Sequence, residues 1–458
     1  MNFDTVCILG LGYIGLPTAS TLATHGLRVI GVDVNPKVVA TLRNGGLHLH
    51  EPGLRTLVRA ALQSGNLSVS ETPAEADAFI IAVPTPFRRT TEDGRQTMDD
   101  GRQTTDDRRQ TVVGGPSSML NTPRADLSYV RAAAEAIVPH LRRGNLVILE
   151  ATSPPRTTVD VVAPILERSG LKAGADFHLA YSPERVLPGQ ILRELIENAR
   201  VIGGIDRPSA EAGRDLYATF VRGEIYLTDA TTAEMVKLME NTYRDVNIAI
   251  ANTFARLSER FGVDVWEAIA LANRHPRVSI LRPGPGVGGH CISVDPWFLV
   301  EAAPDLAQLI ATARQVNDTQ PRFVVELTRR ALGDLFGKRI AVLGLAYKPD
   351  VDDLRESPAI EVAHLLQAEG ALVKAYEPYK VDAALEGLTL VPTLEAALED
   401  ADALLLLVGH RPFRELRPSE VAALTPARLV VDTVNLWNPA PWEAAGFAVY
   451  RLGVGGNG

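Results

Sequence analysis

The chain has 458 residues, and at roughly 150 residues per domain this length predicts about three domains. Hydrophobic residues make up 46 % of the chain and charged residues 22 %, which are ordinary values for folded proteins and exclude a wholly disordered chain. The 46 Lys and Arg against 55 Asp and Glu give a net charge of −9, so no overall basic field attracts nucleic acid or an anionic membrane surface.

The distribution of apolar residues, cysteines and histidines bears on location. The longest apolar stretches, such as residues 403–408, fall far short of the roughly 20 residues of a membrane span. The first residues carry no basic segment typical of a signal peptide, and two cysteines, Cys7 and Cys291, exclude a disulfide framework. The histidines show no metal-ligand spacing. We therefore expect a cytoplasmic protein with no membrane partner, no nucleic acid partner and no metal.

Residues 1–215 alternate strand-like and helical patterns. Strands are expected over residues 6–9, 28–33, 78–83, 146–149 and 177–180. This alternation predicts a Rossmann-type, doubly wound parallel sheet with helices on both faces, and hence an α/β fold. Residues 88–124 do not fit it, because residues 91–97, 98–104 and 105–111 are near-copies of one unit without apolar heptad positions. We expect a solvated, disordered insert there.

The pattern changes after residue 216. Residues 231–272 read as nearly continuous helix, opened by a capping-box pattern at Thr231 and Glu234, and the first part is apolar on several sides. We therefore expect a helical domain over residues 216–325, with a long buried helix that links domains. Strand-like runs return at residues 339–343, 371–376 and 403–408 and predict a second Rossmann-like α/β domain over residues 326–458. Residues 453–458 read as a frayed tail.

A glycine pattern follows the first expected strand. Gly10, Gly12 and Gly15 form Gly-x-Gly-x-x-Gly, and Asp33 closes the next strand 18 residues after Gly15. Such glycines let the backbone approach a pyrophosphate at a helix start, and the carboxylate accepts from a ribose 2′-hydroxyl. The pattern alone also suits an ordinary tight turn, but its place between strand and helix favours NAD. Asp33 would repel a 2′-phosphate, whereas nearby Lys37 leaves NADP open.

Cys291 stands at the end of a glycine-dense loop, residues 284–289. An isolated cysteine is often a small buried hydrophobe, but a glycine-dense loop is where backbone and ligand approach closely, so a covalent nucleophile is favoured. Asp295 precedes Pro296, an arrangement that suits a helix N-cap as well as a functional carboxylate. Both roles stay open for it.

Basic and amide side chains gather in three further segments. Lys237, Asn241 and Arg244 share one helix face and suit a phosphate and a developing oxyanion, although a solvated face explains the same spacing. Residues 274–277 suit phosphate or sugar hydroxyls, or form a plain surface loop. Lys348 and Arg355 follow the first strand of the last domain and suit phosphate.

Together these segments resemble the nucleotide-sugar 6-dehydrogenases. The matching segments span nearly the whole chain outside the insert, and they are residues 10–17, 83–86, 182–189, 234–241, 274–277, 284–291, 344–348 and 354–358. Within that family they are most similar to members that oxidise UDP-N-acetyl-D-mannosamine. The resemblance implies an N-terminal NAD domain, a central domain that forms a homodimer or higher homo-oligomer, and a C-terminal UDP-binding domain.

The resemblance also implies the chemistry: four-electron oxidation of the sugar C6 hydroxyl to the uronate, for surface polysaccharide biosynthesis. Cys291 matches the nucleophile that forms a thiohemiacetal and then a thioester. Lys237 matches the proton donor and acceptor that steadies the oxyanion, with Asn241 beside it. Asp295 and Glu184 match positions associated with water activation or organisation of the site.

The binding residues implied by the resemblance form two sets. The substrate set is Arg185, Val186, Lys237, Asn241, Arg244, His275, Arg277, Gly288, Tyr347 and Lys348. The cofactor set is Gly10, Gly12, Tyr13, Ile14, Gly15, Asp33, Thr85, Thr152 and Arg355.

Two departures keep alternatives open. Val434 stands where the family usually has an arginine, and the insert lies beside Thr85. A UDP-glucose 6-dehydrogenase is the first alternative, but Arg185-Val186 and Ser293-Val294 stand where its members have Phe-Leu and Pro-Lys. A two-electron hydroxyacid dehydrogenase would need no thiol. A non-catalytic module that binds NAD or a nucleotide sugar is the third.

Overall fold

The computed structural model describes residues 3–49, 51–90, 96–98, 123–187, 189–289 and 291–455. By contacts the chain divides into two compact units. The first unit comprises Met1–Asp99, Gly114–Glu240 and Glu301–Pro304, and the second comprises Asp100–Val113, Asn241–Val300 and Asp305–Gly458.

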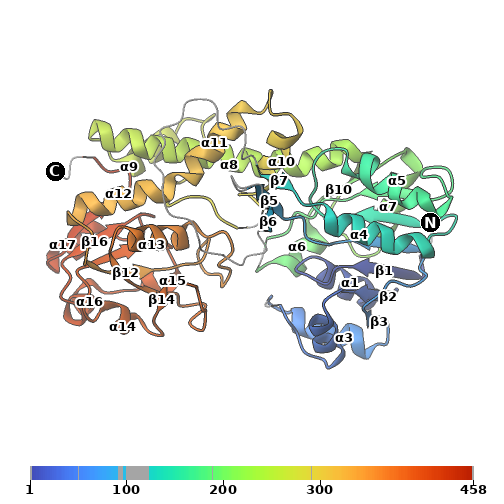
Figure 1. Cartoon of the computed structure of the whole chain (residues 1–458), viewed down its shortest axis with the longest axis horizontal. Coiled ribbons are helices and arrows are strands. Elements are labelled where there is room, and N and C mark those ends of the chain that lie inside the picture. Colours follow the sequence, from blue (N-terminus) through green and yellow to red (C-terminus); the bar gives the residue numbers. More distant parts are fainter. Residues whose placement is uncertain are drawn as a thin grey trace. The chain divides into compact units, whose positions relative to one another are not determined.

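The first unit contains a sheet in the strand order β11-β10-β9-β8-β4-β1-β2-β3. Figure 1 labels β1, β2, β3 and β10 of this sheet. Neighbouring strands are parallel except β9 and β10, which are antiparallel. The prediction of a parallel sheet is thus confirmed apart from this one pair, which proves important for the site. The strands are β1 (Thr5–Leu9), β2 (Arg28–Val32), β3 (Leu67–Ser70), β4 (Ala78–Ile81), β8 (Leu146–Leu149), β9 (His178–Tyr181), β10 (Arg200–Gly204) and β11 (Ile225–Asp229).

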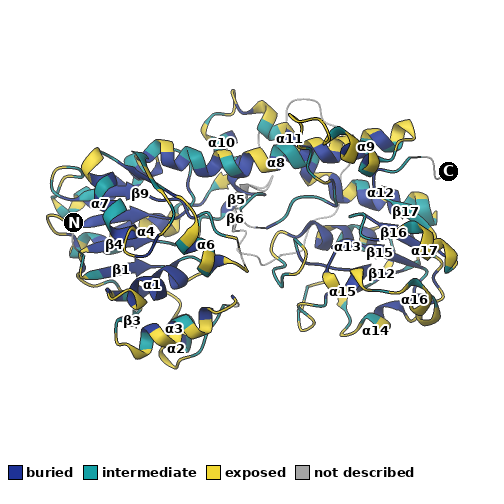
Figure 2. Ribbon diagram, turned by 180° about the vertical axis from the view of Figure 1, so that it is seen from behind, coloured by how far each residue is buried: buried dark blue, intermediate teal, exposed yellow. Residues whose placement is uncertain are grey.

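Helices cover both faces of this sheet because alternate residues of each strand point to opposite sides. Val6 and Ile8 of β1 join a buried cluster with α1, α3, α6 and α7, whereas Cys7 and Leu9 join another with α4 and α5. The inner strands β1, β4, β8 and β9 are almost entirely buried, whereas the edge strands β3 and β11 are partly exposed (Figure 2). The helices are α1 (Gly15–Thr24), α2 (Pro36–Arg43), α3 (Leu54–Gln63), α4 (Ser128–Ile137), α5 (Ala163–Leu166), α6 (Ile191–Glu197) and α7 (Arg207–Tyr217), with short turns η2 (Val138–His140), η3 (Thr158–Val162) and η4 (Glu167–Ser169).

The second unit contains an all-parallel sheet in the order β14-β13-β12-β15-β16-β17, as the sequence predicts for this domain. Its faces are likewise covered by two clusters, one with α12 and α13 and one with α14, α16 and α17. The elements are β12 (Arg339–Leu343), β13 (Leu372–Tyr376), β14 (Thr389–Leu390), β15 (Ala403–Leu406), β16 (Leu429–Asp432), β17 (Ala448–Arg451), α12 (Gln320–Leu332), α13 (Pro358–Ala368), α14 (Leu394–Leu398), α15 (Arg411–Arg414), α16 (Pro418–Leu424) and α17 (Pro439–Ala444).

The predicted helical stretch forms α8 (Ala230–Phe261) and α9 (Val265–Ala272), and α10 (Asp295–Ala302) and α11 (Gln308–Asp318) follow. The predicted capping box is wrong. Asp229 caps α8 by accepting the N–H of Thr232 at 2.9 Å, and the Glu234 carboxylate instead accepts the N–H groups of Arg156 and Thr158. Glu234 is buried in the first unit, where two loop N–H groups offer partners that the helix start does not.

Two segments were predicted to lack regular structure, the C-terminal residues 453–458 and the insert over residues 88–124. Residues 453–455 are not frayed, because the Gly453 N–H donates to Glu259 at 3.0 Å and the Gly455 N–H donates to the Val263 carbonyl at 3.1 Å. Residues 456–458 lie outside the described residues. Most of the insert likewise lies outside the described residues. β5 (Phe87–Thr90), β6 (Gln96–Met98) and β7 (Arg124–Ala125) form a small antiparallel sheet. Because β6 lies inside the repeats, the prediction of disorder is wrong for residues 96–98.

No helix within the described ranges combines the length and the apolar character needed to cross a membrane.

Candidate functional site

The glycine turn after β1 is shaped by close backbone approach. Gly10 has a φ of +96°, and a Cβ there would lie 2.6 Å from the Ala82 carbonyl oxygen. A Cβ at Gly15 would lie 1.8 Å from the Gly10 carbonyl oxygen, whereas Gly12 faces open space. Tyr13 and Ile14 complete the turn, and α1 begins at Gly15 without a side-chain cap. A helix start of this kind leaves N–H groups for a pyrophosphate.

Asp33 stands at the end of β2 and is half-buried. Its carboxylate accepts the N–H of Leu11 at 3.0 Å and the N–H of Asn35 at 2.9 Å. The first contact ties the acid to the glycine turn. Because a carboxylate accepts about four hydrogen bonds, Asp33 keeps lone pairs for a ribose hydroxyl. Glycine turn, uncapped helix start and carboxylate together fit the NAD that the sequence predicts.

Two further predicted cofactor residues are brought together. The Thr85 hydroxyl donates to the Thr152 carbonyl at 2.5 Å. These threonines follow β4 and β8, which are adjacent parallel strands, so both lie at the carboxyl edge of the sheet. Ligands of open α/β sheets bind at that edge.

Glu184, Arg185, Val186 and Lys237 all belong to the first unit. Glu184 and Lys237 are each only 9 % exposed, so neither is a solvated surface charge. The Arg185 guanidinium pairs with Glu240 of α8 at 2.7 Å, and Val186 packs against the buried cluster of the sheet. The loop after β9 is therefore anchored to the segment of α8 that carries Lys237.

In the second unit, Asn241 and Asp295 are direct partners. Asn241 Nδ2 donates to Asp295 Oδ2 at 2.5 Å, and both side chains are buried. The Asp295 N–H donates to the Cys291 carbonyl at 2.8 Å, so Cys291 precedes Asp295 by one hydrogen-bonded turn of the backbone. Asp295 is the first residue of α10, and its carboxylate accepts the hydrogen bond from Asn241.

The glycine loop packs against the loop that follows β12. A Cβ at Gly288 would lie 2.4 Å from the Glu356 carbonyl oxygen and 2.9 Å from Cβ of Tyr347. The Gly289 N–H donates to the Arg355 carbonyl at 3.2 Å. The predicted Gly288, Tyr347 and Arg355 thus meet, and no residue larger than glycine fits at position 288.

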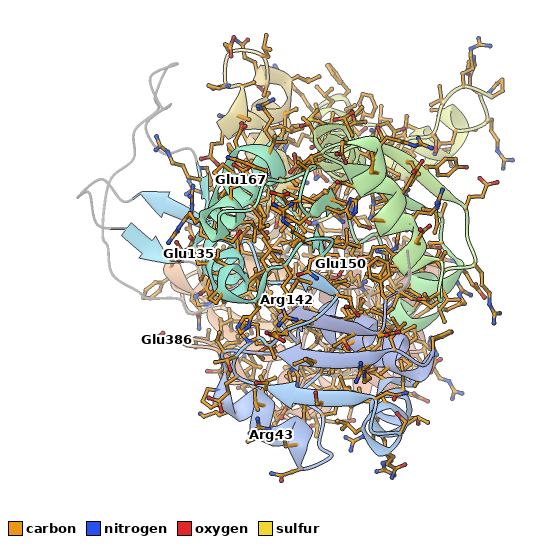
Figure 3. All side chains as sticks on the ribbon, turned by 90° about the vertical axis from the view of Figure 1, so that its right-hand side faces the viewer. Arg43, Glu135, Arg142, Glu150, Glu167 and Glu386 are labelled. Atoms are coloured by element: carbon orange, nitrogen blue, oxygen red, sulfur yellow. The ribbon has the colours of Figure 1, made fainter. Side chains whose placement is uncertain are left out.

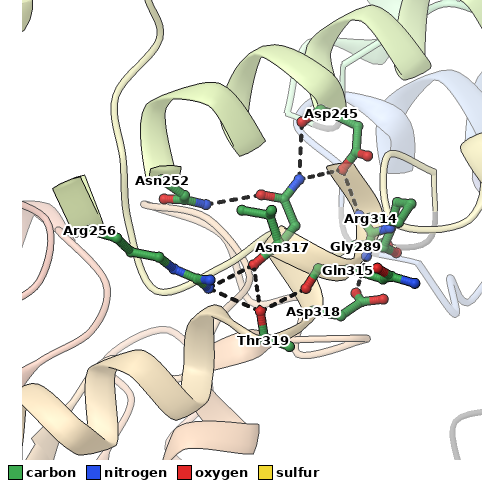
Figure 4. Close-up of polar contacts among 11 residues, drawn as sticks. Asp245, Asn252, Arg256, Gly289, Arg314, Gln315, Asn317, Asp318 and Thr319 are labelled. Carbon is green, nitrogen blue, oxygen red and sulfur yellow. Dashed lines mark hydrogen bonds and ion pairs between the residues drawn. The ribbon is translucent and has the colours of Figure 1, made fainter. Parts of the chain in front are cut away.

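A buried polar network on α8 supports this loop (Figure 4). Asn252 accepts the N–H of Gly284 at 3.0 Å and donates to Asn317 Oδ1 at 3.0 Å. Asn317 donates to Asp245 at 2.8 Å, and Arg314 donates to the same oxygen at 2.6 Å. Sequence reasoning missed these residues. Asp245 and Asn252 follow Asn241 at spacings of four and eleven residues, and this spacing is the signal that places all three on one face of the helix.

The prediction of a long buried helix holds for only one side of α8. The buried side of α8 mixes small or apolar residues such as Ala233, Leu238 and Ala255 with polar ones, whereas Met239 is 57 % exposed and Tyr243 is 66 % exposed. Lys237 and Asn241 are buried, so the solvated-face alternative fails for them, but Arg244 is exposed. Polar residues face inward here because loop N–H groups need acceptors.

The remaining predicted residues sit near the loops of the second unit. His275 and Arg277 are exposed in the loop after α9. The Lys348 ammonium lies 5.5 Å from the centre of the Tyr347 ring. Arg282 donates to the carbonyl oxygens of Val434 and Asn435 at 3.2 and 3.4 Å. A guanidinium from the glycine-loop segment thus reaches the Val434 turn.

Glu377 and His410 are buried residues that sequence reasoning also missed. Glu377 follows β13 and accepts the N–H groups of Leu345 and Ala346 at 2.7 and 2.9 Å. His410 Nε2 lies 3.0 Å from the same carboxylate oxygen, and Nδ1 accepts the N–H of Asp350 at 2.9 Å. This pair holds the backbone on both sides of Tyr347 and Lys348.

Three domain models of one family match the chain. The NAD binding domain of the UDP-glucose/GDP-mannose dehydrogenase family matches residues 4–110 and 100–221. The central domain of that family matches residues 231–319, and its UDP binding domain matches residues 341–439.

Curated relatives match along almost the full length. The UDP-N-acetyl-D-mannosamine dehydrogenase of Methanocaldococcus jannaschii is 47 % identical over 99 % of this chain and 97 % of its own. The NDP-N-acetyl-D-galactosaminuronic acid dehydrogenase of Ralstonia nicotianae is 46 % identical over 96 % of this chain and 97 % of its own. Among solved structures, the UDP-D-ManNAc dehydrogenase of Pyrococcus horikoshii has a TM-score of 0.85 at 38 % identity, covering 98 % of this chain and 99 % of its own.

Proposed function

The chain belongs to the UDP-glucose/GDP-mannose dehydrogenase family, and on this premise we propose that it oxidises UDP-N-acetyl-D-mannosamine at C6 to the uronate with NAD. The family makes the chain an NAD-binding dehydrogenase with a UDP binding domain. The observation that carries the chemistry is the Asn241–Asp295 pair one turn from Cys291. The choice of sugar is supported by the relative from Methanocaldococcus jannaschii and by Arg185-Val186 and Ser293-Val294.

Cys291 is the proposed nucleophile. When bound, NAD would supply the hydride acceptor for each of the two oxidations at C6, and the glycine turn and Asp33 would hold it. Between these oxidations the Cys291 thiolate adds to the C6 aldehyde and forms a thiohemiacetal, which the second hydride transfer converts to a thioester. Water then breaks the C–S bond, and the products are the uronate and the restored thiolate. Covalent capture keeps the aldehyde in place for the second oxidation.

Lys237 and Asn241 are proposed to serve the oxygen at C6. Burial of the Lys237 side chain strengthens its interaction with a developing oxyanion, and the ammonium can return a proton to that oxygen. The amide of Asn241 has two N–H hydrogens, of which one serves Asp295, so the other is left for the oxyanion. Asp295 thereby fixes the orientation of the amide.

Glu184 and Asp295 are the proposed carboxylates for the hydrolytic water. Both are buried, and each accepts a hydrogen bond, Glu184 from Arg200 and Asp295 from Asn241. This proposal also includes the predicted substrate contacts. It keeps the three predicted domains of the chain, residues 1–215, 216–325 and 326–458.

The test is a product count with a panel of UDP-sugars: N-acetylmannosamine, N-acetylgalactosamine, N-acetylglucosamine and glucose. We expect two NADH and one uronate per UDP-N-acetylmannosamine, with slower turnover of the others. Preference for the galactosamine or glucose substrate would contradict the assigned sugar. One NADH with released aldehyde would contradict covalent capture, and no turnover of any sugar would favour the non-catalytic alternative.

A second copy of the chain is the proposed partner of the exposed face of α8. Apolar residues recur on it at spacings of three, four or seven residues, namely Met239, Tyr243, Ile250, Phe254, Leu257 and Phe261. Contiguous exposed apolar surface of this kind marks an interface. Light scattering should give a dimer or larger for the wild type and a smaller species for Ile250→Glu. The cytoplasmic location and the role in polysaccharide synthesis stay predictions.

A further inference from the structure

In the first unit, Glu184 belongs to a buried cluster of polar side chains that also contains Glu150, Arg200 and Tyr217. Glu150 follows β8, and Glu184 lies just after β9, which is parallel to β8. Arg200 is the first residue of β10, which runs antiparallel to β9. The start of β10 therefore lies at the edge where β8 and β9 end. Because β10 and β11 run opposite to the other strands of the sheet, Arg200 lies at the edge where β8 and β9 end and not at the opposite edge.

The cluster is connected by short contacts. Arg200 Nη2 donates to Glu184 Oε2 at 2.6 Å, and Arg200 Nη1 donates to Glu150 Oε1 at 3.2 Å. The Tyr217 hydroxyl donates to the same Glu150 oxygen at 2.5 Å, and its ring centre lies 4.1 Å below the guanidinium carbon of Arg200. Glu150, labelled in Figure 3, lies among packed side chains and is 3 % exposed.

One arginine therefore serves two buried carboxylates. With both ionised the cluster carries an excess negative charge, and Glu150 Oε2 has no hydrogen-bond partner among the residues that the structure describes. Burial raises the pKa of Glu150 to about 7, and the charge of Glu184 adds to this, while Arg200 and Tyr217 oppose it. Burial also holds the pKa of Tyr217 well above its usual range, so its hydroxyl stays a donor.

We propose that Arg200 is the positioning residue of Glu184, and that Glu150 sets how strongly the Arg200 charge acts on Glu184. When Glu150 loses its proton, its negative charge competes with Glu184 for the Arg200 guanidinium. Arg200 then stabilises the charge of Glu184 less, and Glu184 accepts a proton from water more readily. The inference rests on the proposed role of Glu184 in hydrolysis. In that step Glu184 takes a proton from water, the water oxygen bonds to the thioester carbon, and the C–S bond breaks with departure of the Cys291 thiolate.

The decisive variant is Glu150→Gln, which keeps the shape of the side chain and an acceptor for Arg200 and Tyr217 but cannot ionise. In the wild type, kcat for uronate formation should rise with pH through about 7, as Glu150 ionises. Below this pH the kcat of the variant should equal that of the wild type. At higher pH the kcat of the variant should be about three- to tenfold lower, because glutamine mimics protonated Glu150. A variant that keeps the inflection would overturn the proposal.

Two further variants give independent readings. Tyr217→Phe removes a donor to Glu150 and should move the inflection to higher pH. Arg200→Lys should lower kcat less than Arg200→Gln, with the KM for NAD unchanged in both. The matched control is Glu51→Gln, another buried carboxylate, which accepts the N–H groups of Gly189 and Ile191 and should keep the wild-type inflection.

Infrared difference spectra of the enzyme without substrates separate this inference from the proposed function. Raising the pH from about 6 to about 8 should remove a protonated carboxyl band and shift the band of an ionised carboxylate, and neither change should appear in Glu150→Gln. The same result with no uronate formed would contradict the proposed function alone. Absence of the protonated band in the wild type would overturn the role of Glu150.

Discussion

Asp33 and Glu377 occupy equivalent places in the two separate sheets. Each follows the second strand of its sheet and accepts the N–H of the leucine after the glycine turn, Leu11 at 3.0 Å and Leu345 at 2.7 Å. Glu377 is 1 % exposed and is also bound by His410, whereas Asp33 is half-buried. Burial alone would raise the pKa of Glu377, but the hydrogen bond from His410 and the backbone contacts hold it below its usual value. Only Asp33 retains access to a ligand.

Asp33→Ala should therefore weaken NAD and relax discrimination against NADP. We expect the KM for NAD to rise about tenfold or more, which corresponds to ~1.4 kcal/mol. Initial rates with both cofactors measure this. Glu377→Gln is the matched control and should leave the cofactor preference unchanged. An unchanged NAD/NADP preference in Asp33→Ala would contradict the ribose assignment.

The two thiols should differ sharply in alkylation. Cys7 is fully buried in β1, and burial raises the pKa of its thiol to about 11, whereas Cys291 is partly exposed. Iodoacetamide should label Cys291 in the folded protein and abolish uronate formation. Mass spectrometry of labelled peptides locates the modification. Cys291→Ser should remove both labelling and uronate formation. Uronate formation by this variant at the rate of the wild type would contradict the covalent mechanism.

Lys237→Ala should lose most of kcat, on the order of 10²-fold or more, because the ammonium serves both proton transfer and oxyanion stabilisation. Steady-state kinetics with saturating NAD measure the effect. If the variant changed only the KM for the sugar nucleotide, Lys237 would be a binding residue and not a catalytic one.

Asn252→Ala should loosen the glycine loop. It removes the acceptor of the half-buried Gly284 N–H and leaves the buried Asn317 Oδ1 without this donor, at a cost of about 1–3 kcal/mol in the free energy of unfolding. Lower kcat, an unchanged KM for NAD and an altered alkylation rate of Cys291 are expected. Asn247→Ala is the control, since that amide on the same helix bonds only within α8 in the contacts described, to the Tyr243 carbonyl. Equal behaviour of the two variants would refute the positioning role.

Glu150 should also make stability depend on pH. Its pKa is about 7 in the folded protein against an ordinary 4.5, so between these values the folded state binds an additional proton. The stabilising contribution is thus fully present below about pH 4.5 and is lost as the pH rises through about 7. Thermal unfolding of the wild type and Glu150→Gln over this range should show the wild-type Tm falling relative to the variant. Parallel curves would show that Glu150 does not titrate in this window.

The sequence alone determined the elements whose signals are local. Gly10, Gly12 and Gly15 between a strand and a helix, with Asp33 after the next strand, marked the cofactor turn because each requirement is met by neighbours in the chain. The repeated strand patterns predicted two α/β domains for the same reason. The sequence also marked the loop around Cys291 as a candidate site, because the density of glycines in residues 284–289 can be counted directly in the sequence.

Tertiary structure decided what depends on distant partners. The inward polar face of α8 could not be read from composition, because Asn252 and Asp245 are buried only where Gly284 and Asn317 supply their hydrogen bonds. Residues 200–204 were not among the predicted strands, and the direction of β10 relative to β9 depends on its partners and not on its own residues. Yet that direction puts Arg200 beside Glu184, and burial there, rather than residue type, gives Glu150 its raised pKa.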